Sequence, residues 1–182
     1  MARLIAMLGT SPGGIFESYK NLIEGNYQGD NVEKVNIDEV YIIRTSDKAV
    51  EFAWKLVKAI FACCGAKGVH VYDIPLSISD ISSRQDFLMF KREVESKINE
   101  GDFVDITGGR KSMSIAAAIS AFKRKARTVT TIVPQAEYNK VQELIKELVP
   151  REKEIQMAGE GKCQTLDVCQ LVSKSALTIL LS

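Results

Sequence analysis

The sequence lacks long apolar runs and has almost no excess of charge of one sign. Charged residues interrupt every apolar stretch before it reaches the roughly 18 to 20 residues of a membrane-spanning helix. Lysine and arginine number 24 and aspartate and glutamate 23, a formal net charge of +1, so the footprint of a general nucleic-acid binder is absent. We therefore expect a soluble protein with no membrane or DNA partner, in which any bound anion meets a local site.

Histidine and paired cysteine motifs are also scarce. There is one histidine, His70, and the cysteines show neither CxxC spacing nor partner histidines for zinc. The cysteines are Cys63, Cys64, Cys163 and Cys169. The apolar residues 1–8 run into Gly9 too early for a signal peptide. These features predict a cytoplasmic protein with free thiols.

The 46% of hydrophobic residues suffices for one ordinary core. β-Branched apolar runs, which predict strands, occur at residues 4–8, 39–44, 68–74, 103–107 and 128–133. Apolar residues at helical spacing occur between them, at residues 15–24, 47–64, 84–99 and 111–126. This alternation predicts an α/β fold with an open, mostly parallel sheet and helices on both faces.

The C-terminal part is less regular. Residues 138–148 predict a last helix, and the charged residues 151–162 predict a connection. Residues 166–172 and 176–181 fit either two closing strands or a short helix followed by one strand. We expect a core over residues 1–135, with residues 136–182 packed on the same domain.

Two loops that follow predicted strands are rich in glycine and hydroxyl groups. Residues 9–14 read Gly-Thr-Ser-Pro-Gly-Gly, and residues 107–112 read Thr-Gly-Gly-Arg-Lys-Ser. Ligands of open α/β sheets bind beyond the carboxyl ends of the strands. Glycines let backbone amides approach a ligand, and a helix N-terminus attracts phosphate.

Neither loop matches the Walker A motif or the G-x-G-x-x-G fingerprint. Each loop alone fits equally well a tight turn that needs glycine for its geometry. The cations Arg110 and Lys111 oppose the dipole of the helix that they begin, and an anion between them explains this better. The two loops together therefore predict a phosphate site.

Both loops resemble those of a known family. Residues 105–113, Asp-Ile-Thr-Gly-Gly-Arg-Lys-Ser-Met, resemble the signature loop of CRISPR-associated Rossmann-fold (CARF) domains, and residues 8–13, Leu-Gly-Thr-Ser-Pro-Gly, resemble their first-strand loop. The resemblance implies a Rossmann-like homodimer that binds cyclic oligoadenylates, the messengers of type III CRISPR complexes. Because only residues 136–182 follow the core, the chain is similar to standalone ring nucleases, which cleave cyclic tetra-adenylate without a metal and end the antiviral signal.

The resemblance also implies the roles of individual residues. Ser11 and Lys111 carry over as the catalytic pair, with Arg110 as a phosphate ligand. No cofactor and no metal are expected. The ligand-binding residues are expected to be Gly9, Thr10, Pro12, Gly13, Thr45, Ser46, Arg84, Asp105, Thr107, Gly108, Gly109, Arg110, Ser112 and Met113.

Several of these residues have a structural alternative. Asp105 fits a turn-stabilising acceptor better than a ligand contact, although with Asp102 it also offers a weak magnesium site. Thr45 and Ser46 precede a helix that they or Asp47 can cap. The basic residues 123–127 end a helix opposite the strand-end site, where cations favour the dipole, so they do not indicate nucleic-acid binding.

The chemistry of ring opening needs no external nucleophile. Each ribose 2′-OH can attack its own 3′-phosphate when it is held in line, which leaves a 2′,3′-cyclic phosphate. Lys111 would stabilise the developing charge, and Ser11 would orient the 2′-OH or a phosphate oxygen. Since His70 lies within a strand pattern, no general base is evident and turnover should be slow. The alternative is a non-catalytic sensor or sponge for cyclic oligoadenylates.

Overall fold

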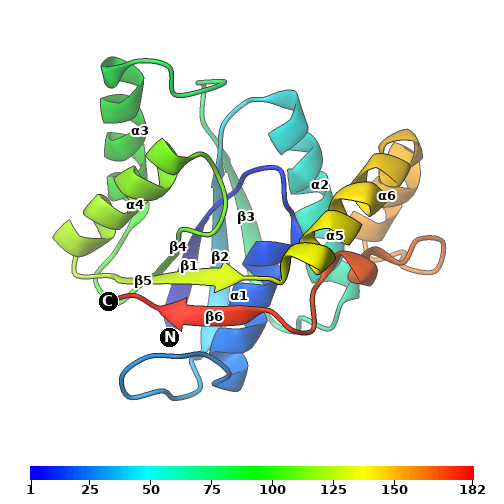
Figure 1. Ribbon diagram of the computed structural model, residues 1–182, viewed down its shortest axis with the longest axis horizontal. Coiled ribbons are helices and arrows are strands. Elements are labelled where there is room, and N and C mark those ends of the chain that lie inside the picture. Colours follow the sequence, from blue (N-terminus) through cyan, green and yellow to red (C-terminus); the bar gives the residue numbers. More distant parts are fainter.

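The computed structural model describes residues 1–182 and contains one six-stranded sheet in the order β3-β2-β1-β4-β5-β6 (Figure 1). All neighbouring strands are parallel except β5 and β6, which are antiparallel. The elements are β1 (Ala2–Met7), α1 (Gly13–Glu24), β2 (Ile37–Arg44), α2 (Lys48–Cys63), β3 (His70–Pro75), α3 (Arg84–Lys97), β4 (Phe103–Asp105), α4 (Lys111–Lys123), β5 (Arg127–Ile132), α5 (Gln135–Leu148), η1 (Val149–Arg151), α6 (Glu152–Gly159), η2 (Val168–Leu171) and β6 (Leu177–Leu180). The predicted Rossmann-like α/β fold is therefore confirmed.

Helices cover both faces of the sheet because side chains alternate along each strand. In β1, Leu4 packs with α1, α2 and the C-terminal elements, whereas Ile5 packs with α3 and α4 on the opposite face. Figure 1 shows α3 and α4 together at one side of the sheet, away from α2, α5 and α6. The central strand β1 is buried on both faces from Leu4 to its end.

The C-terminal part corrects one prediction and decides between two alternatives. Residues 151–162 are not merely a connection, because Glu152–Gly159 forms α6. The buried Ile155 and Ala158 hold this short helix against α2. The tail forms a short 3-10 helix, η2, followed by the single strand β6, so the alternative of two closing strands is wrong.

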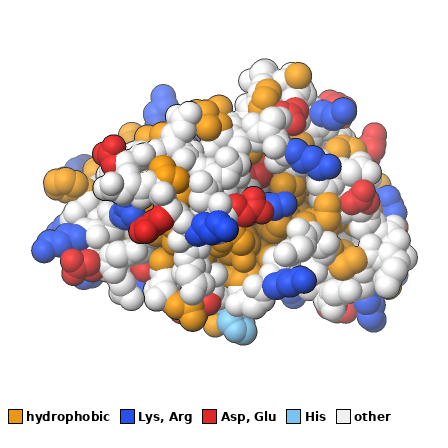
Figure 2. Space-filling view, turned by 90° about the horizontal axis from the view of Figure 1, so that it is seen from below, with side chains coloured by type: hydrophobic (Ala, Val, Ile, Leu, Met, Phe, Trp, Pro, Cys, Tyr) orange, Lys and Arg blue, Asp and Glu red, His pale blue; other side chains and the backbone are white.

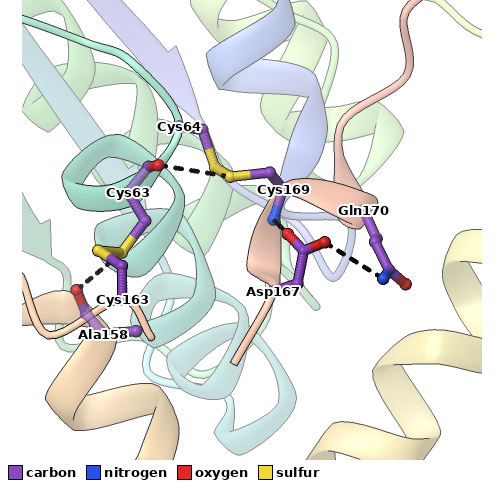
Figure 3. Close-up of a disulfide and its surroundings, with 7 residues drawn as sticks. All are labelled: Cys63, Cys64, Ala158, Cys163, Asp167, Cys169 and Gln170. Carbon is purple, nitrogen blue, oxygen red and sulfur yellow. Dashed lines mark hydrogen bonds between the residues drawn. A yellow bond between two sulfur atoms is a disulfide. The ribbon is translucent and has the colours of Figure 1, made fainter. Parts of the chain in front are cut away.

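The cysteines are not free thiols, so that prediction was wrong. Cys63 is bonded to Cys163 and Cys64 to Cys169, so all four cysteines are in disulfides. Figure 3 shows both bridges fastening the end of α2 to the chain that follows α6 and to η2. Each bridge joins residues at least 100 positions apart. Spacing along the chain therefore gave no signal of the pairing.

The surface bears charges of both signs. In Figure 2, acidic and basic side chains are interspersed over the face that carries the only histidine. His70 begins β3 and is exposed at the end of the strand opposite its carboxyl end. No helix combines the length and the apolar character that crossing a membrane would require.

Candidate functional site

The two glycine-rich loops meet because β1 and β4 are neighbours in the sheet. A Cβ atom on Gly108 would lie 2.5 Å from the carbonyl oxygen of Met7, and one on Gly9 would lie 2.6 Å from the amide nitrogen of Gly109. Any side chain at Gly9 or Gly108 would force the two backbones apart. Glycine is therefore needed here for close approach of one loop to the other.

A cavity of about 470 Å³ opens between the loops at the carboxyl ends of the strands. The residues around it come from the loops after four strands and from the first turns of α2, α4 and α5. They are Leu8, Gly9, Thr10, Ser11, Thr45, Asp47, Val50, Ser79, Asp80, Thr107, Gly108, Gly109, Arg110, Met113 and Tyr138. Nine of them are among the predicted site residues, which the fold thus brings together from distant parts of the chain.

The helix α4 begins at this cavity and α1 begins beside it, and both differ from their neighbours at their N-termini. Neither α1 nor α4 has a side-chain cap or an acidic residue in its first turn. By contrast, Asp47 caps α2 and Ser83 caps α3 through hydrogen bonds to backbone amides. The amides at the start of α1 and α4 thus have no side-chain acceptor, an arrangement that suits a bound anion.

Polar side chains of the two loops have different partners. Ser11 accepts a hydrogen bond from the amide of Gln142 on α5, with 3.1 Å between Oγ and Nε2. Arg110 forms an exposed ion pair with Asp80, 3.1 Å between Nε and Oδ1. Lys111 is exposed and forms no ion pair within the chain. The ammonium group of Lys111 is therefore available to a ligand.

Asp105 and Thr107 form a buried support beneath the loop. Asp105 is fully buried, and its Oδ1 accepts hydrogen bonds from the amide and the hydroxyl of Thr107. The Thr107 hydroxyl in turn accepts from the amide of Thr131 on β5. Burial raises the pKa of Asp105, and its Oδ2 has no partner in the chain. The structure therefore gives Asp105 the turn-stabilising role and places it away from the cavity.

The remaining predicted residues lie outside the lining of this cavity. Ser46 and Arg84 are exposed at the starts of α2 and α3, and Pro12 is buried at the start of α1. Lys111 and Ser112 form the first turn of α4 at its edge, and Gly13 lines a second cavity described below. Asp102 is bound to Arg3, with 2.6 Å between Oδ2 and Nη2, so it does not converge with Asp105 on a magnesium site.

A second cavity, of about 320 Å³, adjoins the first. Ser11, Thr107 and Tyr138 line both cavities. Sequence reasoning missed Tyr138 and Glu17, and of these Glu17 is buried at 6% exposure beside the second cavity. Only the end of β5 and the course of the chain after it bring Tyr138 to the site, and no motif marks either residue.

No family model matches the chain. A CRISPR system ring nuclease of Saccharolobus solfataricus is 40% identical over 185 residues, which cover 98% of this chain and 98% of that protein. The chain belongs to the CRISPR ring nucleases. The family expected from the two loop motifs is thus confirmed.

Two solved structures are also similar to this ring nuclease. Csm6 of Enterococcus italicus, bound to cyclic hexa-2′-fluoro-hexa-dAMP, has 19% identity and a TM-score of 0.49, covering 85% of this chain and 40% of that one. Can2 of Sulfobacillus thermosulfidooxidans, in complex with cyclic tetra-adenylate, has 14% identity and a TM-score of 0.44, covering 70% of this chain and 31% of that one. The ring nuclease therefore spans less than half the length of either protein.

Proposed function

We propose that this ring nuclease binds cyclic tetra-adenylate between the β1–α1 and β4–α4 loops and cleaves it without a metal. The products would be linear di-adenylates that end in a 2′,3′-cyclic phosphate, and the reaction would switch off type III CRISPR signalling. The observation that supports the proposal is the meeting of two glycine loops at one cavity, with the uncapped N-terminus of α4 at that cavity and the uncapped N-terminus of α1 beside it. That arrangement suits a ligand with several phosphates.

The chemistry requires positioning more than added reactants. The ribose 2′-oxygen attacks the adjacent 3′-phosphorus, the bond from phosphorus to the 5′-oxygen breaks, and the 5′-oxygen takes up a proton as the 2′-OH loses one. Lys111 at the start of α4 stabilises charge on the non-bridging oxygens, and Ser11 orients the 2′-OH or a phosphate oxygen. With His70 at the far end of β3, the reaction proceeds without a histidine base and is slow.

The proposed assembly is a homodimer formed across α4. Ile115, Ile119 and Phe122 are 48%, 45% and 87% exposed, and their spacing places them on one side of the helix. Lys111 lies one turn before Ile115 on the same side. A second copy packed on this stripe would bring two Lys111 side chains toward one ring, and a twofold axis matches a ring of four equal units.

The first experiment is incubation with cyclic tetra-adenylate in EDTA, with products identified by chromatography and mass. We expect linear di-adenylate with a cyclic phosphate. An intact ring that binds tightly would contradict the proposed cleavage and would leave the sensor or sponge as the function. An intact ring that does not bind would indicate that the glycines of the two loops serve only the geometry of the turns.

Lys111→Ala tests the catalytic role within that assay. We expect kcat to fall by about a hundredfold with a smaller change in KM, because the ammonium group acts mainly on charge that develops in the transition state. Lys123→Ala, at the other end of α4, is the matched control and should retain activity, since it loses only a surface ion pair with Glu95. A loss of affinity alone in Lys111→Ala would contradict the catalytic role.

A further inference from the structure

The second cavity has a wall composition unlike that of the first. It lies between α1, the end of β5, α5 and the segment after η2. Its apolar lining residues are Ile132, Val133, Tyr138, Val141 and Leu171. No lysine or arginine lines it. An apolar pocket with a few polar groups suits a flat organic ring.

Glu17 is one of seven polar residues that line this cavity. Its Oε2 accepts a hydrogen bond from the amide of Ser173 at 3.3 Å, whereas its Oε1 has no hydrogen bond in the chain. Glu137, the other acid of the cavity, already accepts from the hydroxyls of Ser173 and Ser175 through its two oxygens. Glu17 is thus a side chain more than nine-tenths buried that keeps one oxygen for a ligand.

The protonation state of this carboxyl fits a particular kind of partner. Burial, with a smaller contribution from the carboxyls of Asp105 and Glu137, raises the pKa of Glu17 to about 7 against the lowering effect of the Ser173 amide. The neutral acid is therefore well populated near neutral pH. A neutral carboxyl both accepts and donates a hydrogen bond. Adenine offers the complementary pair in its 6-amino group and an adjacent ring nitrogen.

We propose that the second cavity is a subsite for an adenine base of the ring, and that Glu17 recognises its 6-amino group. Ser11, Thr107 and Tyr138 line both cavities, so a nucleotide whose phosphate lies between the loops can place its base there. The apolar side chains of the cavity contact the two faces of the base, and Glu17 forms a hydrogen bond to its edge. This inference rests on the proposed function, since it assigns part of the same ligand.

The test compares cyclic tetra-adenylate with a ring of the same size built from purine riboside, which lacks the 6-amino group. For the wild-type protein we expect a KM about tenfold higher for the purine ring, which is the loss of about one hydrogen bond. Glu17→Gln should lose this preference, because its side-chain oxygen stays on the Ser173 amide and its NH2 group, which cannot accept from the 6-amino group, faces the cavity. Glu17→Met should have the same KM for both rings.

Two further variants keep the test decisive. Glu24→Gln, at the exposed end of α1 and outside the lining of this cavity, is the control and should retain the preference for the adenine ring. Val141→Trp fills the cavity from α5 and leaves Glu17 in place. It should raise KM for the adenine ring by at least about tenfold. This variant tests the cavity even if Glu17→Met does not fold.

The outcomes separate this inference from the proposed function. If the wild-type protein cleaves the adenine ring but shows no preference over the purine ring, the assignment of Glu17 is wrong and the proposed function stands. A purely structural Glu17 would lower stability in Glu17→Met and leave the ratio of the two KM values unchanged, which would also overturn the inference. Failure of the wild-type protein to bind or cleave either ring would instead overturn the proposed function.

Discussion

Glu17 makes the free energy of unfolding depend on pH. Its carboxyl has a pKa of about 7 in the folded chain, against 4.5 for an exposed group, because of burial and the nearby Asp105 and Glu137. Between these values the folded state holds a proton that the unfolded state has released. The free energy of unfolding therefore falls as pH rises through this window, by on the order of 3 kcal/mol when complete.

We predict that Glu17→Gln removes this contribution. Urea unfolding from about pH 5 to about pH 8 should show a smaller loss of stability in the variant than in the wild-type protein. Glu24→Gln, at the exposed end of the same helix, is the control and should follow the wild-type curve. A Glu17→Gln curve parallel to the wild-type curve would show that the carboxyl is ionised in the folded state.

Residues of the candidate site differ in how visible they are in the sequence. The glycines of the two loops could be predicted, because glycine next to a strand end has a specific geometric use. Glu17 could not, since it lies among apolar residues of α1 and only the position of Ser173 and α5 encloses it. The sequence also does not show whether Lys111 lines the cavity or is exposed beside it, and in the structure it is exposed beside it.

At the scale of elements, the five parallel strands were predicted with ends within two residues of those observed. Their apolar, β-branched runs are long enough to be distinct from the helices between them. The helix α6 was missed because only Ile155 and Ala158 of its residues are buried, too few for a helical period in a charged segment. Its position depends on α2, so tertiary packing decides it.

The two disulfides give a prediction at the same scale. Both close loops of nearly the same extent, with separations of 100 and 105 residues, so either bridge alone retains most of the constraint on the unfolded chain. Replacing Cys64 and Cys169 together by serine should therefore cost much less stability than replacing all four cysteines. The full replacement should cost roughly 2–5 kcal/mol.

Denaturation curves with and without a reductant check this result. The reduced wild-type protein should unfold like the variant without cysteines, and a non-reducing peptide map should show the two bridges. If reductant leaves the curve of the wild-type protein unchanged, the bridges do not contribute to its stability. Equal losses from each bridge that sum to the total would contradict the shared constraint.

At the scale of the whole molecule, the exposed stripe on α4 predicts the state of association. Ile119→Asp places a charge at the centre of the stripe and should weaken the proposed dimer at least about tenfold, because burying an isoleucine contributes roughly 1.5–3 kcal/mol. Ring cleavage should fall with it at low protein concentration. Light scattering after gel filtration measures the first effect, and the cleavage assay measures the second.

A matched exposed apolar residue provides the control. Val32, in the loop between α1 and β2, is 43% exposed and lies outside the stripe, so Val32→Asp should leave mass and activity unchanged. A wild-type protein that is monomeric at assay concentration and still cleaves the ring would contradict the need for two copies.

The last strand is paired along both of its edges. β6 is antiparallel to β5, and Gln28 forms a bridge to Ile179 on the other side. Thr178 also completes a row of hydroxyls with Thr131 and Ser18. During synthesis β6 leaves the ribosome after every other strand, so β5 remains an open edge until then. The nascent chain would be most prone to association with other chains through the β5 edge in this interval, which ends when β6 pairs with β5.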